Sequence, residues 1–310
     1  MSAKNSNSHL GLSLSLVFAV FLWGGNNTGT KFIVASWPPI WTGGSRFFLA
    51  GLLMLVLLRW TTLLGKRSGT LGPDLRKRLW WHGGLSLAIY IVAFNTALRF
   101  TSASHVALYL GTAPVWALLW EAPPRFDGST LRRYGAAALA LAGIVILFWP
   151  ALQHSTGTWV GELLGLSASV LWTNYGRQCR ALGAELSGAE TSAHTMWRAG
   201  LLLLPFGLLE IGFKGIVWRN DVALVQLYCI LAGGVTAFAI WSNALRRWPT
   251  SQVLLFNNLI PLSTTLWAHF WLREPITPNF WFAMLLVVTG VVLGQGSWRL
   301  LIPSRTAPPE

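Results

Sequence analysis

Long apolar segments follow one another along almost the whole chain and constrain its fold more than any other feature. A helix needs about 20 mainly apolar residues to cross the roughly 30 Å hydrocarbon core of a bilayer. Hydrophobic residues make up 53% of this chain and charged residues 11%, whereas charged residues supply about 25% of an ordinary soluble domain. We therefore predict an all-α integral membrane protein with ten transmembrane helices, near residues 10–35, 38–59, 79–98, 103–121, 133–150, 159–180, 191–209, 222–245, 250–272 and 279–299.

An internal repeat divides the chain into two related halves. Residues 97–114 and 244–261 align without a gap at an offset of 147. The identical pairs are Ala97/Ala244, Leu98/Leu245, Arg99/Arg246, Ser104/Ser251, Val106/Val253, Leu108/Leu255 and Pro114/Pro261. Further matches are Trp23 with Trp172, Gly51 with Gly200 and Gly143 with Gly290. Because a repeat of this kind decides the fold class, we predict two units of five helices each.

The placement of Lys and Arg predicts how these units cross the membrane. Cytoplasmic loops are enriched in both residues, and the basic residues gather in alternate loops, on the side that the two termini share. Because five is an odd number, the second unit enters from the opposite side, which gives an inverted repeat with a substrate site near the midplane, as in many secondary transporters. We expect a cytoplasmic tail at 1–9, repeats at 10–150 and 151–300, and a cytoplasmic tail at 301–310.

Several other classes of function lack their signatures. The sequence has no Gly-rich phosphate loop and no Cys-x-x-Cys pair, and Cys179 and Cys229 lie inside apolar segments. The net charge of +13 is spread over short loops, so we interpret it as a topology signal and expect no nucleic-acid partner. We predict no enzyme activity, no cofactor and no metal site.

Two arginines lie inside predicted helices. Charge in hydrocarbon is costly, so an ionisable residue within a span is a candidate functional residue. Arg46 and Arg198 are therefore candidates to bind a substrate carboxylate, although each could instead extend toward a lipid headgroup. No Asp or Glu lies deep in a span, so a buried carboxylate relay is not predicted, and proton coupling and facilitated diffusion both stay open.

Aromatic and amide side chains predict the character of the site. Away from helix ends lie Trp23, Tyr90, Tyr109, Trp172 and Trp241, together with Asn26, Asn95, Asn257 and Asn258. An amide in hydrocarbon needs a hydrogen-bond partner, so we expect these side chains to face a shared cavity. Such a cavity suits an aromatic solute with a polar head. The alternative is that these side chains only hold helices together.

Two prolines occupy equivalent places in the repeat. Pro114 and Pro261 fall near the middle of their predicted helices, where proline removes a backbone hydrogen bond and permits a kink. We predict a pair of hinges that close opposite ends of one cavity in turn.

These motifs together resemble one known family. Leu22-Trp23-Gly24, Leu171-Trp172, Arg46-Phe47, the repeated Ala-Leu-Arg with its later Pro, Arg273-Glu274-Pro275, Gly143 and Gly290 are similar to the drug/metabolite transporter superfamily of ten-helix EamA-type permeases. The resemblance covers about residues 10–300. Trp23, Tyr90, Trp172 and Trp241 look most like the YddG group of aromatic amino-acid exporters. Phe126-Asp127-Gly128 departs from the pattern, because a Glu-containing turn is usual there.

The resemblance implies export of Phe, Tyr, Trp and related solutes across a bacterial inner membrane by alternating access. The partners would then be amino acids, as small-molecule substrates, and membrane lipid. Two other functions stay open. One is a permease of the same architecture for another metabolite, a nucleobase or a drug, because fold does not set function. The other is a membrane channel or scaffold without a transport cycle.

Overall fold

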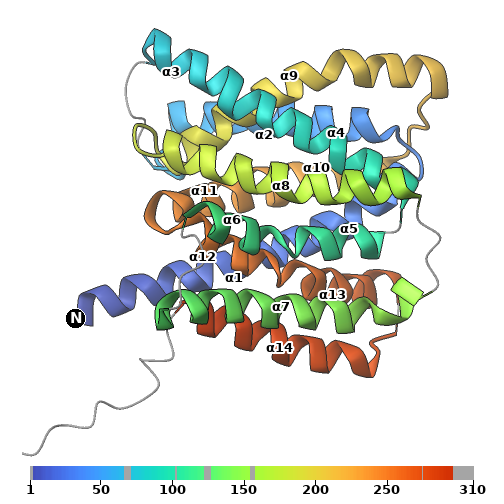
Figure 1. Cartoon of the computed structure of the whole chain (residues 1–310). Coiled ribbons are helices and arrows are strands. Elements are labelled where there is room, and N and C mark those ends of the chain that lie inside the picture. The colour runs from blue at the N-terminus through green and yellow to red at the C-terminus, as the bar shows by residue number, and fades with distance from the viewer. Residues whose placement is uncertain are drawn as a thin grey trace, which may run out of the picture.

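The computed structural model describes residues 3–65, 71–101, 103–121, 127–153, 158–273 and 275–295, and every regular element in these ranges is a helix. The helices form a bundle with roughly parallel axes (Figure 1). Glu274, Phe126 and the predicted tail at 301–310 lie outside the described residues. We call the left side of Figure 1, where α1 begins, the N-terminal end of the bundle, and the right side the opposite end.

Six of the predicted segments are single helices, namely α1 (Ala3–Val34), α2 (Pro39–Trp60), α7 (Gly128–Gln153), α8 (Trp159–Leu182), α9 (Gly188–Lys214) and α14 (Pro278–Gln295). Two more contain a wider π-helical stretch, α3–η1–α4 (Pro73–Arg78, Leu79–Gly84, Leu85–Phe100) and α10–η2–α11 (Asn220–Tyr228, Cys229–Ala237, Phe238–Arg247). The last two are interrupted, α5 and α6 (Ala103–Leu110, Ala113–Glu121) and α12 and α13 (Thr250–Asn257, Ile260–Leu272). Each predicted segment is therefore helical.

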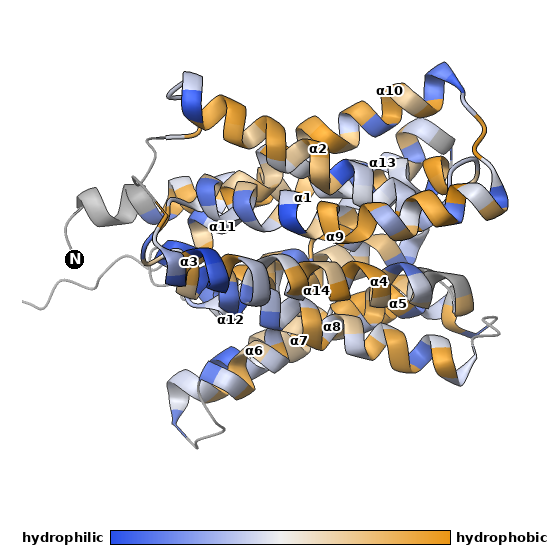
Figure 2. Cartoon of the chain, turned by 90° about the horizontal axis from the view of Figure 1, so that it is seen from above, coloured by the Kyte–Doolittle hydropathy of each residue, from blue (hydrophilic) through white to orange (hydrophobic). Residues whose placement is uncertain are grey.

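The lengths and exteriors of these helices suit a membrane. Six helical stretches in the described ranges are long and apolar enough to cross one: His9–Val34, Pro39–Trp60, Gly128–Pro150, Gly188–Lys214, Asn220–Arg247 and Pro278–Gln295. Large apolar side chains such as Val56, Phe206 and Leu285 lie exposed on their outer faces. Figure 2 shows long hydrophobic stretches on α2 and α10, whereas α3 is hydrophilic. The protein is therefore a multi-pass membrane protein.

Glycines from equivalent positions of the two halves make reciprocal contacts. A Cβ atom on Gly51 of α2 would lie 2.3 Å from the backbone nitrogen of Trp197 in α9. A Cβ on Gly200 of α9 would lie 2.3 Å from the backbone nitrogen of Phe48 in α2. Only glycine allows two helix backbones to approach this closely. The α2–α9 contact therefore contains the same close approach twice, once from each half.

The same reciprocity recurs between α7 and α14. A Cβ on Gly143 would meet Ala283 and Val287 of α14, and a Cβ on Gly290 would meet Ala136 and Ala140 of α7. The partners on the two sides are separated by 147 residues, the offset of the sequence repeat. The sequence repeat therefore corresponds to a repeated packing arrangement.

The interruptions of the two broken helices precede the two prolines. The first break is at Gly111 and Thr112, and Pro114 is the second residue of α6. The second break is at Asn258 and Leu259, and Pro261 is the second residue of α13. Proline is compatible with the first turn of a helix because its missing N–H has no intrahelical partner there. Each proline therefore begins a new helix.

The four half-helices pack differently at the two ends of the bundle. At the N-terminal end, α6 packs against α12. At the opposite end, α5 packs against α8 and α13 packs against α1, and α5 and α13 do not form a comparable contact with each other. In the described part of the chain, the two broken helices are thus in close contact at the N-terminal end, through α6 and α12.

Candidate functional site

Four indole and phenyl rings form the centre of an aromatic cluster inside the bundle. Trp23 of α1 lies with its ring centroid 6.1 Å from that of Trp172 in α8 and 5.3 Å from that of Phe238 in α11. Trp172 stacks on Trp241 of α11 with centroids 4.8 Å apart and an interplanar angle of 21°. The predicted residues Trp23, Trp172 and Trp241 are therefore brought together, from three helices and from both halves of the chain.

The cluster extends to further helices. The Tyr90 ring of α4 lies 4.9 Å from Trp172, and the Phe47 ring of α2 lies 5.7 Å from Phe238. Tyr175 stacks on Trp241 at 5.9 Å and bonds Thr195 through its hydroxyl at 2.8 Å. Phe47, Tyr175 and Phe238 were not among the residues that the sequence predicted to line the site. A spacing of three residues, from Trp172 to Tyr175 and from Phe238 to Trp241, places each pair on one helix face and could have identified two of them.

The π-helical segment η2 supplies a polar edge to the cluster. The Trp23 indole N–H donates to the carbonyl oxygen of Gly233 at 3.0 Å. The Trp241 indole nitrogen is buried without a hydrogen-bond partner in the described part of the chain. An indole N–H in an apolar interior normally has an acceptor, so the Trp241 N–H is an unsatisfied donor within the cluster.

Arg46 lies at the border of this cluster. Its guanidinium donates to Asn26 Oδ1 at 3.2 Å and to Thr30 Oγ1 at 2.8 Å, both on α1. It lies 5.1 Å from the ring centroid of Phe47 and within electrostatic range of the Tyr90 hydroxyl. Among the described residues no Asp or Glu pairs with Arg46. The half-buried cation is therefore held by neutral oxygens and is electrostatically suited to an anionic group.

Arg198, the second predicted arginine, occupies a different environment. It packs between the indole rings of Trp80 and Trp197, with its central carbon 5.2 and 4.4 Å from their centroids. Its guanidinium donates to the carbonyl of His194 at 2.9 Å. Among the described residues, its ring and hydrogen-bond contacts are with Trp80, Trp197 and His194, which lie outside the aromatic cluster. Arg198 therefore serves as a matched comparison for Arg46.

The predicted amides do not share one cavity. Asn26 bonds Arg46, and Asn95 Nδ2 donates to the carbonyl of Pro39 at 3.3 Å. Asn257 Oδ1 and both polar side-chain atoms of Asn258 are buried without a hydrogen-bond partner in the described structure. Asn257 is the last residue of α12, and Asn258 lies in the break between α12 and α13. Asn26 is thus the amide that the structure brings to the aromatic cluster through Arg46.

Tyr109 belongs to a separate polar cluster at the opposite end of the bundle. Its hydroxyl donates to Glu162 Oε2 at 2.7 Å. The other carboxylate oxygen of Glu162 accepts from Thr101 at 2.6 Å and lies 2.7 Å from His105 Nδ1. His105 and Tyr109 are spaced by four residues, which places them on one face of α5, and Thr101 follows the end of α4. This spacing is the signal that could have identified Glu162 from the sequence.

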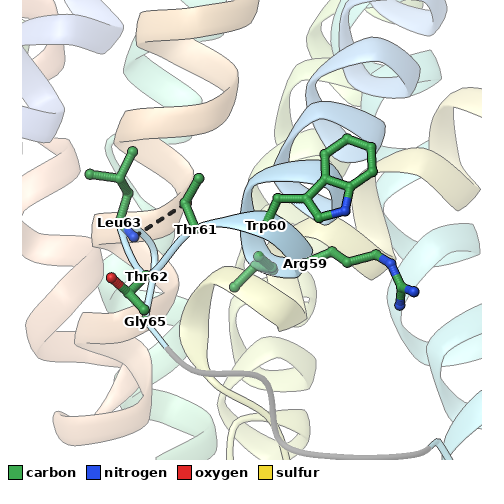
Figure 3. Close-up of a pocket in the computed structure, with 7 residues that line it drawn as sticks. Arg59, Trp60, Thr61, Thr62, Leu63 and Gly65 are labelled. Carbon is green, nitrogen blue, oxygen red and sulfur yellow. Dashed lines mark hydrogen bonds between the residues drawn. The ribbon is translucent and has the colours of Figure 1, made fainter.

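A surface pocket and the question of a metal site remain to be described. A surface pocket of about 700 Å³ lies beyond the end of α2 (Figure 3). Its lining residues are Leu58, Arg59, Trp60, Thr61, Thr62, Leu63 and Gly65. No group of three or more His, Cys, Asp or Glu side chains that could hold a metal ion occurs among the described residues.

The turn that departs from the family pattern has a local structural role. Asp127 accepts hydrogen bonds from the backbone N–H groups of Ser129 and Thr130 at 3.0 and 2.9 Å. Hydrogen bonds from the Ser129 hydroxyl and from Thr130 hold the pKa of the Asp127 carboxyl below its usual range. An Asp in this position caps the start of a helix. Asp127 therefore stabilises the beginning of α7.

Several known proteins are similar to this chain over nearly its full length. An uncharacterized transporter of Archaeoglobus fulgidus is 25% identical over 302 residues, covering 93% of this chain and 97% of the relative. The uncharacterized inner membrane transporter YedA of Escherichia coli K12 is 25% identical, with coverages of 89% and 88%. A probable amino-acid metabolite efflux pump of the same strain is 20% identical, with coverages of 89% and 92%.

A solved crystal structure and a family model complete the comparison. The crystal structure superimposes with a TM-score of 0.73 at 19% identity, covering 94% of this chain and 99% of that chain, which shows a shared fold. The model of the EamA-like transporter family matches residues 10–149 and 159–294. The two matches together include most of the sequence and nearly all of the described helices. This chain therefore belongs to the EamA-like transporter family.

Proposed function

We propose that this transporter exports amino acids, with a preference for Phe, Tyr and Trp. The observation that carries the proposal is the position of Arg46 next to the aromatic cluster. The guanidinium binds the substrate carboxylate through two parallel hydrogen bonds, and the Trp23, Trp172 and Trp241 rings bind an aromatic side chain by edge and face contacts. The E. coli relative described as a probable amino-acid metabolite efflux pump supports the same substrate class.

The transport cycle in this proposal is alternating access in a bacterial inner membrane. The ten helical segments span the membrane as two inverted repeats of five, residues 10–150 and 151–300, with both termini in the cytoplasm. The reciprocal contacts of Gly51 with α9 and of Gly200 with α2 support this relation. Pro114 and Pro261 act as hinges that allow the half-helices to change partners. The opposite end of the bundle then faces away from the cytoplasm.

A substrate panel in proteoliposomes tests the proposal. Purified protein is reconstituted in liposomes that are each loaded with one unlabelled solute, and the initial uptake of the same solute in labelled form is compared for Phe, leucine, adenine and phenethylamine, which is an aromatic amine without the carboxylate. We expect saturable exchange of Phe, slower exchange of leucine, and no exchange of phenethylamine or adenine. Adenine exchange without Phe exchange would favour a nucleobase permease. Non-saturable flux of all four would indicate a channel.

Arg46 and Arg198 provide a matched pair of variants. Replacing Arg46 by Gln removes a charge-assisted bond worth roughly 1.5–3 kcal/mol, so we expect the KM for Phe to rise roughly 10- to 100-fold. R198Q removes a cation whose contacts are with Trp80, Trp197 and His194 rather than with the cluster, and it should change the KM far less. Equal effects of the two substitutions would contradict the assignment of Arg46.

A further inference from the structure

The polar cluster at the opposite end of the bundle joins one half of a broken helix to α8. Glu162 lies in the first turn of α8, and its carboxylate is contacted from α5 and from Thr101, the residue that follows the end of α4. Thr101 and Tyr109 donate to it at 2.6 and 2.7 Å, and His105 Nδ1 lies 2.7 Å from Oε1. The side chains of His105 and Glu162 are 20% and 26% exposed, so water can exchange protons with the pair. One carboxylate thus contacts two successive turns of α5 and the end of α4.

The second half of the chain shows how α5 would pack if the opposite end of the bundle closed. In the repeat, α12 corresponds to α5, and α1 corresponds to α8. The helix α12 packs mainly against α6, whereas α5 packs mainly against α8. If the two halves exchange these arrangements, α5 leaves α8 and joins α13. The bonds to Glu162 would then have to break.

His105 is the member of the pair that becomes a cation when it binds a proton, which makes its contact with Glu162 an ion pair. Histidine is the side chain that ordinarily titrates over roughly pH 5 to 8. The other titratable or charged groups on the elements packed around α5 and α8 are Tyr90 and Arg99 on α4, Glu121 on α6, Arg132, Arg133 and Tyr134 on α7, Arg177, Arg180, Tyr175 and Cys179 further along α8, Glu190, His194, Arg198, Glu210 and Lys214 on α9, Arg246 and Arg247 on α11, and His82 on η1. The Arg99 side chain and His154 lie outside the description. None of the described groups in this set bonds Glu162.

We propose that His105 and Glu162 form a proton-binding site that acts as a latch on α5. This inference rests on the proposed function, because it assumes that α5 moves during transport. A proton from the solution at this end binds to the imidazole and converts a neutral contact into an ion pair. Charge-assisted hydrogen bonds are roughly twice as strong as neutral ones. Acid therefore holds α5 on α8 and keeps this end open, and a rise in pH releases it.

A distance measurement tests the latch without reference to any substrate. Spin labels are attached at Ala107→Cys in α5 and Phe270→Cys in α13, in a background in which the buried Cys179 and Cys229 are replaced by Ala. The distance distribution is recorded in liposomes by double electron–electron resonance at about pH 5 and about pH 8, which bracket the usual range of histidine. We expect a longer distance in acid, with a roughly fivefold change in the ratio of the two populations.

Three variants separate the proton site from a merely structural contact. E162Q and H105Q cannot form the ion pair, so the distance should no longer depend on pH. Y109F removes one bond but keeps the pair, so its pH response should match that of the unsubstituted background. A pH response retained in E162Q, no response in the background, or a shorter distance in acid would overturn the proposal. R46Q should keep the response, so a failure of the substrate assignment stays distinguishable from a failure of the latch.

Discussion

Equivalent half-helices pack differently at the two ends of the bundle. At the N-terminal end, α6 lies against α12, and Glu121 accepts hydrogen bonds from the backbone N–H of Ser251 at 3.2 Å and from its hydroxyl at 2.5 Å. At the opposite end, α5 is bonded to α8 through Glu162, and α13 is packed on α1. One repeated unit therefore adopts two packing arrangements within a single molecule.

In the proposed transport cycle, this difference supplies the two states. The half-helices at the opposite end would then adopt the arrangement that α6 and α12 show at the N-terminal end, because the two halves are related in sequence. The glycine contacts between α2 and α9, in contrast, are the same in both halves. We therefore interpret α2 and α9 as the fixed part of the molecule and the broken helices as the moving part.

The largest effect is expected from a substitution that disrupts the fixed part. In Gly51→Ala the added Cβ would lie 2.3 Å from the backbone nitrogen of Trp197, and a backbone atom cannot rotate away. Overpacking of this kind costs about 1–3 kcal/mol or more. We expect lower thermal stability in detergent and loss of both end arrangements.

Gly212→Ala is the matched control. Gly212 lies in α9, the helix that Gly51 contacts, and a Cβ added to it would meet nothing within 4 Å. Alanine is favoured over glycine in a helix by roughly 1 kcal/mol, so this variant should be as stable as the parent or more stable. Equal thermal stability of the two variants would contradict the assignment of α2 and α9 as the fixed part.

A smaller effect is expected from a substitution at the N-terminal end alone. Glu121→Ala leaves the backbone N–H of Ser251 without its acceptor in a residue that is 4% exposed. An unsatisfied buried donor costs about 1–3 kcal/mol. We expect α6 and α12 to separate more often, which accessibility of an introduced cysteine to a thiol reagent would measure.

Glu185→Gln provides the comparison at the same end of the bundle. Glu185 pairs with Arg78 at 2.5 Å, but its side chain is 46% exposed, and surface ion pairs contribute about 0–1 kcal/mol. The accessibility of the α6–α12 contact should not change in this variant. A change as large as that of Glu121→Ala would mean that the carboxylate of Glu121 has no specific role.

The sequence predicted the helices well because their signal is long and repeated. Each segment of about 20 apolar residues became helical, and the resemblance to EamA-type permeases was confirmed by the family model. Kinks were predicted at Pro114 and Pro261, whereas the structure has interruptions that precede these prolines, at Gly111 and Asn258. The π-helical segments were not predicted, because the pairs Gly83-Gly84 and Gly233-Gly234 do not by themselves distinguish a π-helix from a close helix contact.

The site was harder to predict because its residues come from separate helices. Trp23, Trp172 and Trp241 were selected from their positions within helices, and the structure brings them together. Tyr109 was grouped with them for the same reason, yet its helix face turns toward Glu162. Glu162 was missed because it lies near a helix end, where a carboxylate has an ordinary structural explanation. Helix position alone does not tell which helices face each other.

The most direct test of the account is to follow both ends of the bundle in the same preparation. One pair of spin labels at Ala107→Cys and Phe270→Cys reports on α5 and α13, and a second at Leu119→Cys and Gln252→Cys reports on α6 and α12. If transport occurs by alternating access, saturating Phe should shorten the first distance in a fraction of the molecules and lengthen the second in an equal fraction. Two distances that change in the same direction, or a change at one end only, would contradict alternating access.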